Sequence, residues 1–171
     1  NNKDITITFN EGKATLNGEP YSSGTKISKE GEYQFRLEDS NGNSVNPYFV
    51  IDRTAPNAPT VSDVTSATTT ITGTSEPESK IKIISGTKIL ASTTTFSDGN
   101  YRINIPSQEA GTKLLITATD RAGNTSAPKE FNVRDTEKPV FSGIQADFIP
   151  VNSKFDPKSG VTARDNVDGD V

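Results

Sequence analysis

Residues 119–126 read TDRAGNTS, and a related stretch, EDSNGNS, stands at residues 38–44. The aspartates of the two stretches, Asp39 and Asp120, lie 81 residues apart (120 − 39). Upstream of each stretch, apolar and polar residues alternate as in a β-strand with one buried face, the apolar residues being Tyr33, Phe35 and Leu37 in one copy and Leu114, Ile116 and Ala118 in the other. The chain therefore contains an internal repeat about the size of one small domain.

A second signal closes each copy of the repeat. Residues 52–56 read DRTAP and residues 135–139 read DTEKP, which places Asp52 and Asp135 83 residues apart (135 − 52). Between these signals the pattern predicts short strands, and the Asp98-Gly99 dipeptide predicts a hairpin turn. The predicted strands lie at residues 71–75, 81–83, 88–95, 101–105, 114–118 and 131–133. Strands of this number and length are typical of a small two-sheet sandwich.

The two signals divide the chain into three predicted units. Residues 53–135 are predicted to form a complete unit. Residues 1–52 are predicted to form a similar unit that lacks its opening strand, with strands at residues 5–9, 13–16, 33–37 and 48–51. Residues 136–171 are predicted to be the truncated start of a third unit, with strands at residues 141–151 and 161–163, because about 35 residues cannot bury a sandwich core alone.

The composition of the 171-residue chain excludes most catalytic chemistry. It contains no Cys, Met, Trp or His, so neither a thiolate nor an imidazole is available as nucleophile, general base or metal ligand. We therefore predict that the chain is not an enzyme and has no catalytic residues. A formal net charge of −4 argues against nucleic acid as a partner.

The sequence contains no recognisable targeting segment. No stretch approaches the roughly 20 apolar residues that a membrane-spanning helix needs. The first residues, NNKD, are not followed by the apolar run of a signal peptide. We interpret the chain as a piece of a longer protein whose localisation signals lie outside it.

Three segments carry a family resemblance. Residues 31–56 and the TDRAGNTS turn resemble the bacterial Ig-like domains of large surface proteins and biofilm-associated adhesins. Residues 160–170, GVTARDNVDGD, are similar to the Ig-like domain of pesticidal crystal proteins, which is common in Gram-positive surface proteins. The resemblance implies an all-β fold of tandem immunoglobulin-like β-sandwich domains.

The same resemblance implies a function. It indicates a non-catalytic spacer or stalk of a bacterial adhesin, secreted or attached to the cell wall, whose partners are neighbouring Ig-like domains. A host surface or matrix ligand would be bound through distal domains. Two alternatives remain open: a ligand-binding module for a host protein or glycan, and accessory domains of a secreted enzyme. For sugar binding, Tyr21 and Tyr48 are the aromatic residues predicted to be exposed.

The acidic turns are the candidate metal sites. Alternating oxygen ligands around a glycine can wrap Ca²⁺, and Asp39, Asn41 and Asn43 alternate around Gly42. Asp120 and Asn124 repeat this arrangement in the second copy. The alternative reading is a metal-free turn, in which Asp caps backbone N–H groups, Gly takes positive φ and Asn tolerates a left-handed conformation.

Further calcium candidates lie at the linkers and near the end of the chain. Asp52 and Asp135 stand at the two linkers, where the family resemblance implies calcium. Asp165, Asp168 and Asp170 place three carboxylates in six residues, which either bind a cation or form a solvated loop. Strand topology predicts the Asp39 turn and Asp52 at opposite poles of one unit unless the link bends back. Either one unit gathers both groups, or a junction site combines Asp52 with a loop of the next domain, after Ile84 or around Asp98.

Two local features predict how the units are held. Pro56 and Pro59 at the first linker, and Pro139 at the second, force extended links that hold successive domains in a rod. Tyr33 follows Gly31-Glu32 and resembles a tyrosine corner, in which the hydroxyl ties back to the chain; plain core packing is the alternative.

Overall fold

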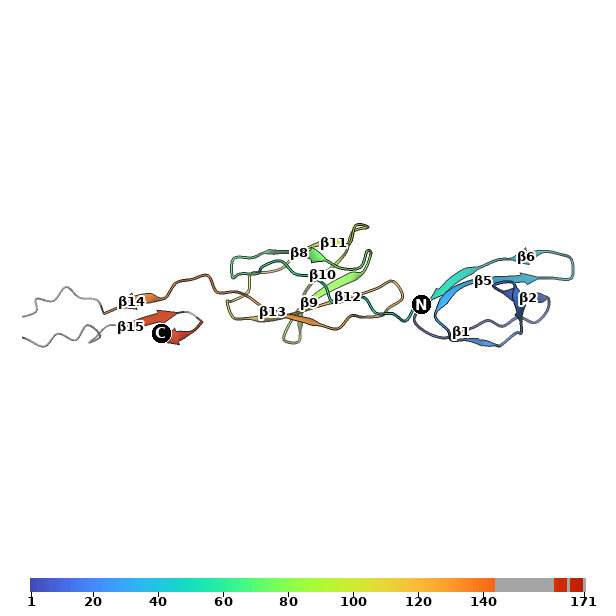
Figure 1. The fold of residues 1–171 in the computed structure, drawn as a ribbon, viewed down its shortest axis with the longest axis horizontal. Helices are drawn as coiled ribbons and strands as arrows, with labels where there is room; N and C mark the ends of the chain where they lie inside the picture. Colours follow the sequence, from blue (N-terminus) through green and yellow to red (C-terminus); the bar gives the residue numbers. More distant parts are fainter. Residues whose placement is uncertain (144–161, 166, 171) are drawn as a thin grey trace, which may run out of the picture.

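The structure is a computed structural model that describes residues 1–143, 162–165 and 167–170. Every regular element in these residues is a β-strand. Two hydrophobic clusters are separate: one is drawn from residues between Ile5 and Ile51, the other from residues between Val61 and Val133. Figure 1 shows the corresponding units one after the other along the long axis.

The first unit is built from seven short strands, which are β1 (Ile5–Thr6), β2 (Lys13–Leu16), β3 (Glu19–Tyr21), β4 (Lys26–Ile27), β5 (Gly31–Glu38), β6 (Ser44–Val45) and β7 (Tyr48–Ile51). One sheet has the order β3-β2-β5, and β6 and β7 pair with successive parts of β5. β1 and β4 form the facing pair. Gly31 pairs with Ile51 at one end of β5, whereas Glu38 lies at the other, so the Asp39 turn and Asp52 lie at opposite poles as predicted.

The strand predicted at residues 5–9 is shorter than expected. Only Ile5 and Thr6 pair in a ladder, because side chains take over the backbone groups that follow. The Ile7 N–H donates to the Tyr21 hydroxyl (3.3 Å), and the Phe9 N–H donates to the Ser23 hydroxyl (2.9 Å).

The middle unit repeats this topology. Its strands are β8 (Thr70–Thr74), β9 (Lys80–Ser85), β10 (Lys88–Thr94), β11 (Asn100–Asn104), β12 (Lys113–Thr119) and β13 (Lys129–Asn132). The sheet β10-β9-β12-β13 corresponds to β3-β2-β5-β7, and the pair β8–β11 corresponds to β1–β4. The registers agree as well: Ile5 faces Ile27 in the first unit, and Ile71 faces Ile103 in the middle one. All six strands predicted here are present.

The predicted hairpin at Asp98-Gly99 is wrong, although the turn exists. The Gly99 N–H donates to the Phe96 carbonyl (3.0 Å), so the chain does reverse there. However, β10 pairs with β9 and β11 pairs with β8, so the turn carries the chain from one sheet to the other. A turn dipeptide specifies the reversal but not the partner of the strand that follows it.

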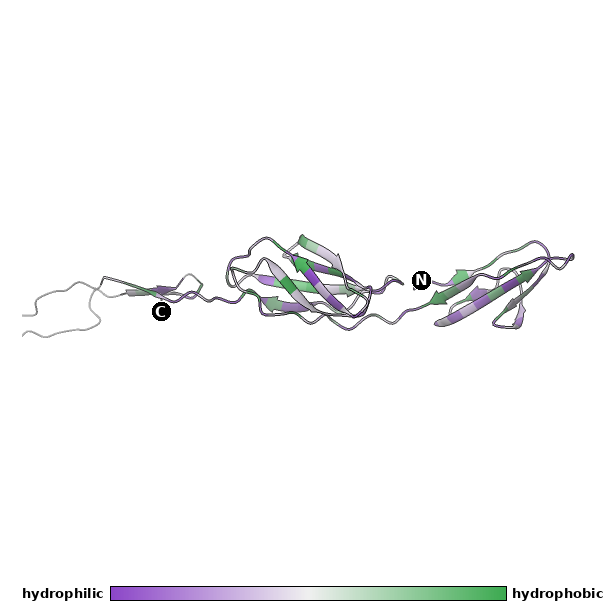
Figure 2. Ribbon diagram, turned by 90° about the horizontal axis from the view of Figure 1, so that it is seen from above, coloured by the Kyte–Doolittle hydropathy of each residue, from purple (hydrophilic) through white to green (hydrophobic). Residues whose placement is uncertain are grey.

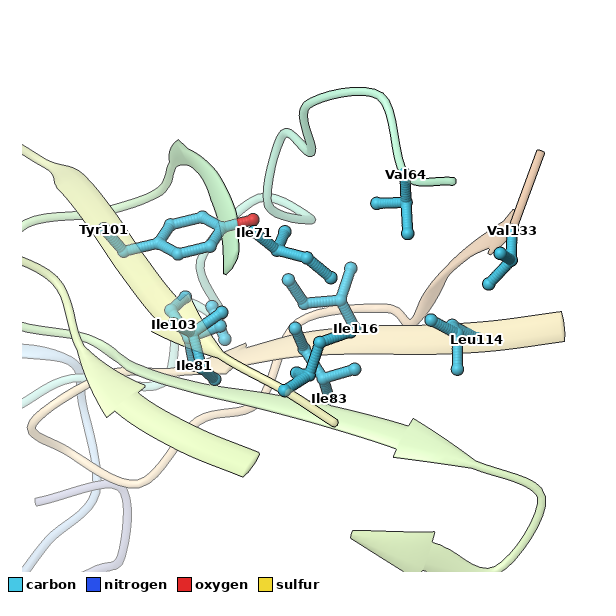
Figure 3. Close-up of a cluster of buried hydrophobic side chains, with 11 residues drawn as sticks. Val64, Ile71, Ile81, Ile83, Tyr101, Ile103, Leu114, Ile116 and Val133 are labelled. Carbon is cyan, nitrogen blue, oxygen red and sulfur yellow. The ribbon is translucent and has the colours of Figure 1, made fainter. Parts of the chain in front are cut away.

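Alternating side chains build the core of the middle unit (Figures 2 and 3). Ile71, Ile81, Ile83, Leu114 and Ile116 are all completely buried between the two sheets. The first unit encloses its core less fully, because most of its apolar contributors are only partly buried, namely Ile5, Ile7, Phe9, Leu16, Tyr33, Leu37 and Phe49.

An extended segment of residues 60–64 closes the middle unit. The Thr60 and Ser62 N–H groups donate to the carbonyls of Thr74 (2.9 Å) and Thr72 (2.8 Å) on β8. The Val64 carbonyl then accepts the Arg134 N–H (2.7 Å) beyond the end of β13. The segment thus ties both sheets together.

Two predictions about tyrosines are resolved by the structure. The Tyr33 hydroxyl donates to the Lys29 carbonyl (2.6 Å), as expected of a tyrosine corner. Tyr48 is 57% exposed, as predicted. The prediction for Tyr21 is wrong, because β3 was not recognised from the sequence. The Tyr21 side chain is only 8% exposed, and its ring packs edge-on against Phe35.

The described part of the third unit is a three-stranded sheet of β14 (Val140–Ser142), β15 (Thr162–Asp165) and β16 (Gly169–Asp170). β15 pairs antiparallel with both neighbours. It contains part of the strand predicted at residues 161–163. Residue 161 and most of the strand predicted at residues 141–151 lie outside the described residues.

Candidate functional site: the turns and junctions between the units

The Asp39 turn is organised around one carboxylate. Asp39 Oδ1 accepts the backbone N–H groups of Asn41 (2.8 Å) and Asn43 (2.9 Å), and Oδ2 accepts Asn43 Nδ2 (2.9 Å). Gly42 provides the bend with a φ of 85°. The Asn43 side chain, followed by the backbone N–H groups of the turn, holds the pKa of Asp39 below its ordinary value.

The Asp120 turn repeats this arrangement. Asp120 Oδ1 accepts the N–H groups of Gly123 (2.7 Å) and Asn124 (2.8 Å), and Oδ2 accepts Asn124 Nδ2 (2.8 Å). Desolvation is the largest single effect on Asp120 and favours the neutral acid. The hydrogen bonds from Asn124, Gly123 and Ala122 together outweigh it and lower the pKa of Asp120.

The Asp120 turn also contacts the first unit. Asn124 Nδ2 donates to the Asp52 carbonyl (2.9 Å), just past the end of β7. The Asp52 N–H in turn donates to the Asn1 carbonyl (2.9 Å). Asn2 lies against the same turn, since a Cβ built on Gly123 would come within 3.5 Å of its Nδ2. A side chain of the middle unit is therefore hydrogen-bonded to the exit of the first.

Further contacts fix the start of this linker to the first unit. The Thr54 hydroxyl donates to Glu30 Oε1 (2.8 Å), which lowers the pKa of Glu30. Arg53 forms an ion pair with Asp4, which also pairs with Lys26. These exposed pairs contribute little stability individually.

The linker itself is extended and partly buried. Residues 52–59 contain no strand or turn, and both Pro56 and Pro59 are buried. Proline has a fixed φ and restricts the residue before it, so such a segment has few alternative conformations.

The second junction brings two carboxylates together. Asp135 Oδ1 accepts the Glu137 N–H (2.9 Å), and Asp165 Oδ1 accepts the N–H groups of Val167 (2.8 Å) and Asp168 (3.1 Å). The backbone hydrogen bonds from Val167 and Asp168 hold the pKa of Asp165 below its ordinary value, and the adjacent Asp135 carboxyl acts in the same direction. Asp165 is buried, whereas Asp168 and Asp170 are exposed.

Comparison with known proteins identifies the middle unit. Residues 55–135 match the family model described as "Bacterial Ig domain". The middle unit is thus similar to a bacterial Ig domain. A solved structure described as "Biofilm associated protein - BSP domain" superposes with a TM-score of 0.46 and 23% identity, over 74% of this chain and 25% of that chain. This chain thus spans about a quarter of that structure's length. No curated protein matches the chain.

The first unit shares the strand pairing and register of the middle unit, although the family match does not extend to it. Among the described residues, no helix is long and apolar enough to cross a membrane.

The residues predicted to bind calcium do not form one site. Asp39, Asn41 and Asn43 lie at the far pole of the first unit, and Asp52 lies at the first junction with Asp120 and Asn124. Asp135 and Asp165 meet at the second junction. Among residues 1–143, 162–165 and 167–170, no group of three or more acidic side chains could hold a metal ion.

The two repeated turns do not fit calcium. Ca²⁺ takes six to eight oxygen ligands. The carboxylates of Asp39 and Asp120 each already accept three N–H bonds from their own turn, with Oδ1 saturated by two of them. The Asp135/Asp165 pair fits better, because the backbone hydrogen bonds described above use only Oδ1 of each.

Sequence reasoning placed Asp52 at a junction with a loop of the next domain, but it did not find the contact. The loops it suggested were those after Ile84 and around Asp98. Ser85 faces Leu114 at the end of β12 remote from Asp120, so the first of these loops lies at the wrong pole. Asn124 was named as a metal ligand, and the structure shows it to be a hydrogen-bond donor to the preceding unit.

Proposed function

We propose that the chain is a non-catalytic spacer of an exported bacterial surface protein of the adhesin type. In this role its Ig units separate a distal binding region from the cell. The observation that supports it best is the hydrogen bond from Asn124 Nδ2 to the Asp52 carbonyl, together with the buried prolines of the linker. A spacer needs successive units to keep their relative orientation, and these contacts limit rotation at the first junction.

The test uses two matched variants. Asn124→Ala removes the bond to Asp120 Oδ2 and the junction bond to Asp52, whereas Asn43→Ala removes only the equivalent bond within the Asp39 turn. We expect Asn124→Ala to increase independent tumbling of the first two units in NMR relaxation and to broaden the distance distribution in small-angle scattering. Asn43→Ala should leave both unchanged. Equal behaviour of the two variants would argue that the junction bond does not orient the units.

Calcium remains part of the proposal at the second junction alone. The carboxyl groups of Asp135 and Asp165 lie within hydrogen-bonding reach of each other. Two such groups repel each other when both are ionised, and a cation between them removes this repulsion. A bound Ca²⁺ would supply this compensation and stiffen the link between the second and third units. We expect excess Ca²⁺ to raise the thermal midpoint of the chain relative to EGTA, and Asp135→Asn to abolish the difference. An identical midpoint in Ca²⁺ and EGTA would remove calcium from the proposal.

The proposed location is secreted or on the cell surface, and the proposed partners are neighbouring Ig units, with any host ligand bound by distal domains. The binding-module alternative makes the opposite prediction for this chain on its own. Immobilised chain exposed to host matrix proteins and glycans should show no saturable binding. Saturable binding that is lost on substitution of the exposed Tyr48 would favour the alternative.

A further inference from the structure

The Asp39 and Asp120 turns have the same internal hydrogen bonds. In each, the aspartate N–H donates to the asparagine carbonyl four residues later, at 2.9 Å from Asp39 to Asn43 and 3.0 Å from Asp120 to Asn124. The asparagine Nδ2 returns to Oδ2, at 2.9 and 2.8 Å respectively. The two turns therefore present the asparagine side-chain amide in the same way.

The second proton of each amide distinguishes the turns. An amide nitrogen carries two protons. In the Asp120 turn one is used within the turn and the other binds the Asp52 carbonyl of the preceding unit. In the Asp39 turn Asn43 is exposed, and the intraturn bond is the only one that its side-chain amide donates within the described part of the chain.

The Asp39 turn is exposed to solvent at the position where the Asp120 turn contacts the first unit. A Cβ on Gly123 would come close to Asn2 of the first unit, whereas a Cβ on Gly42 would have no neighbour within 4 Å. A groove of about 670 Å³ borders the turn. It is lined by Glu11, Gly12, Lys13, Glu38 and residues 39–42, so its charge is predominantly acidic.

We propose that the Asp39 turn and this groove form a docking site for the exit strand of another Ig unit. A main-chain carbonyl at the position that Asp52 holds in its own unit accepts the free proton of Asn43 Nδ2. Both exit segments of this chain carry an exposed arginine, Arg53 after Asp52 and Arg134 at the position that corresponds to Asp52. Each makes an exposed ion pair in its own unit, with Asp4 and Asp63 respectively, and its positive charge suits an acidic groove. The inference rests on the proposed spacer function and adds a head-to-tail contact at the far pole of the first unit.

The test is a tandem protein that supplies such an exit strand. Residues 53–134 are placed ahead of Asn1 through a second copy of residues 53–63, so that Arg134 takes the place of Asp52. This length is set by the structure, because the Asn1 carbonyl accepts the Asp52 N–H much as the Val64 carbonyl accepts the Arg134 N–H. We expect the Asn43 side-chain amide to exchange more slowly in the tandem protein than in the parent. Asn43→Ala should lower the ratio of docked to undocked units about five-fold, the worth of roughly one net hydrogen bond.

The outcomes separate this inference from the proposed function. If Asn124→Ala loosens the first junction but Asn43→Ala leaves the new junction unchanged, the docking site is refuted and the spacer proposal stands. If neither variant has an effect, both fail. As a second measurement, a peptide of residues 48–58 at millimolar concentration should shift the amide resonances of Gly42 and Asn43 in the parent chain; unshifted resonances would count against docking.

Discussion

Replacing Gly73 by alanine should destabilise the middle unit more than its small size suggests. A Cβ at Gly73 would lie 2.1 Å from the Thr60 carbonyl oxygen and 2.7 Å from the Tyr101 hydroxyl. The Thr60 carbonyl cannot easily move, because Thr60 is held at both of its backbone groups. Its carbonyl accepts a hydrogen bond from the Tyr101 hydroxyl (2.6 Å), and its N–H donates to the Thr74 carbonyl. The closing segment must therefore shift outward.

The magnitude follows from these contacts. Overpacking costs about 1–3 kcal/mol, and weakening one hydrogen bond of the closing segment adds about 1 kcal/mol. Alanine has a lower backbone entropy than glycine in the unfolded chain, which offsets roughly 0.4–1 kcal/mol of this destabilisation. We expect a net loss of about 1–3.5 kcal/mol in the free energy of unfolding of this unit, measured by urea unfolding with hydrogen exchange of the β8 and β12 amides.

Gly86→Ala is the matched control within the same unit. Gly86 has a φ of 57° and nothing within 4 Å of its Cβ position, so alanine there costs only backbone strain of about 1–2 kcal/mol. A Gly73→Ala variant whose stability lies within about 0.5 kcal/mol of the parent would refute the argument that residues 60–64 are fixed against β8.

Three further predictions follow from burial and charge. Burial raises the pKa of Tyr101 to about 12, so the neutral Tyr101 side chain stabilises the fold below the unfolded pKa near 10, and this stabilisation is lost as the pH rises through 12. In a pH series of unfolding midpoints, Tyr101→Phe should therefore show a flatter decline at alkaline pH than the parent. The pKa values of Asp39 and Asp120 are lowered, so their contribution is present above roughly pH 4 and is lost as the pH falls through the folded values; urea midpoints of the two Asp→Asn variants should show a shallower acid decline. Ile116→Ala, at a fully buried position, should cost about 2–5 kcal/mol in urea unfolding, and Ile5→Ala, at a partly buried one, should cost less.

Alternation of apolar and polar residues was sufficient to predict the strands of the middle unit. Ile81, Ile83, Leu114 and Ile116 point inward with a period of two, and each lies in a strand with a buried face. The strands β3 and β4 of the first unit escaped prediction because each has three residues or fewer, too few to show a period. This omission also caused the wrong prediction for Tyr21.

The turn chemistry was predictable, but its partners were not. Asp, Gly and Asn at fixed spacing indicate the Asp120 turn from sequence alone. The acceptor of Asn124, however, is the backbone carbonyl of Asp52, which every residue type possesses and which leaves no signature in the sequence. Only the register of β7 and the length of the linker place that carbonyl within reach of the turn. Similarly, no local pattern indicates that Asp135 and Asp165 meet.

The choice of a main-chain acceptor at the first junction has a consequence for how such chains change over evolutionary time. A connection between two side chains would need a compensating substitution whenever a repeat was exchanged. Here the donor lies on the incoming unit, and the preceding unit contributes only its polypeptide backbone. Repeats of divergent sequence could be duplicated, deleted or shuffled by recombination while the coupling between neighbours survived, so the array could change in length without redesign of its joints.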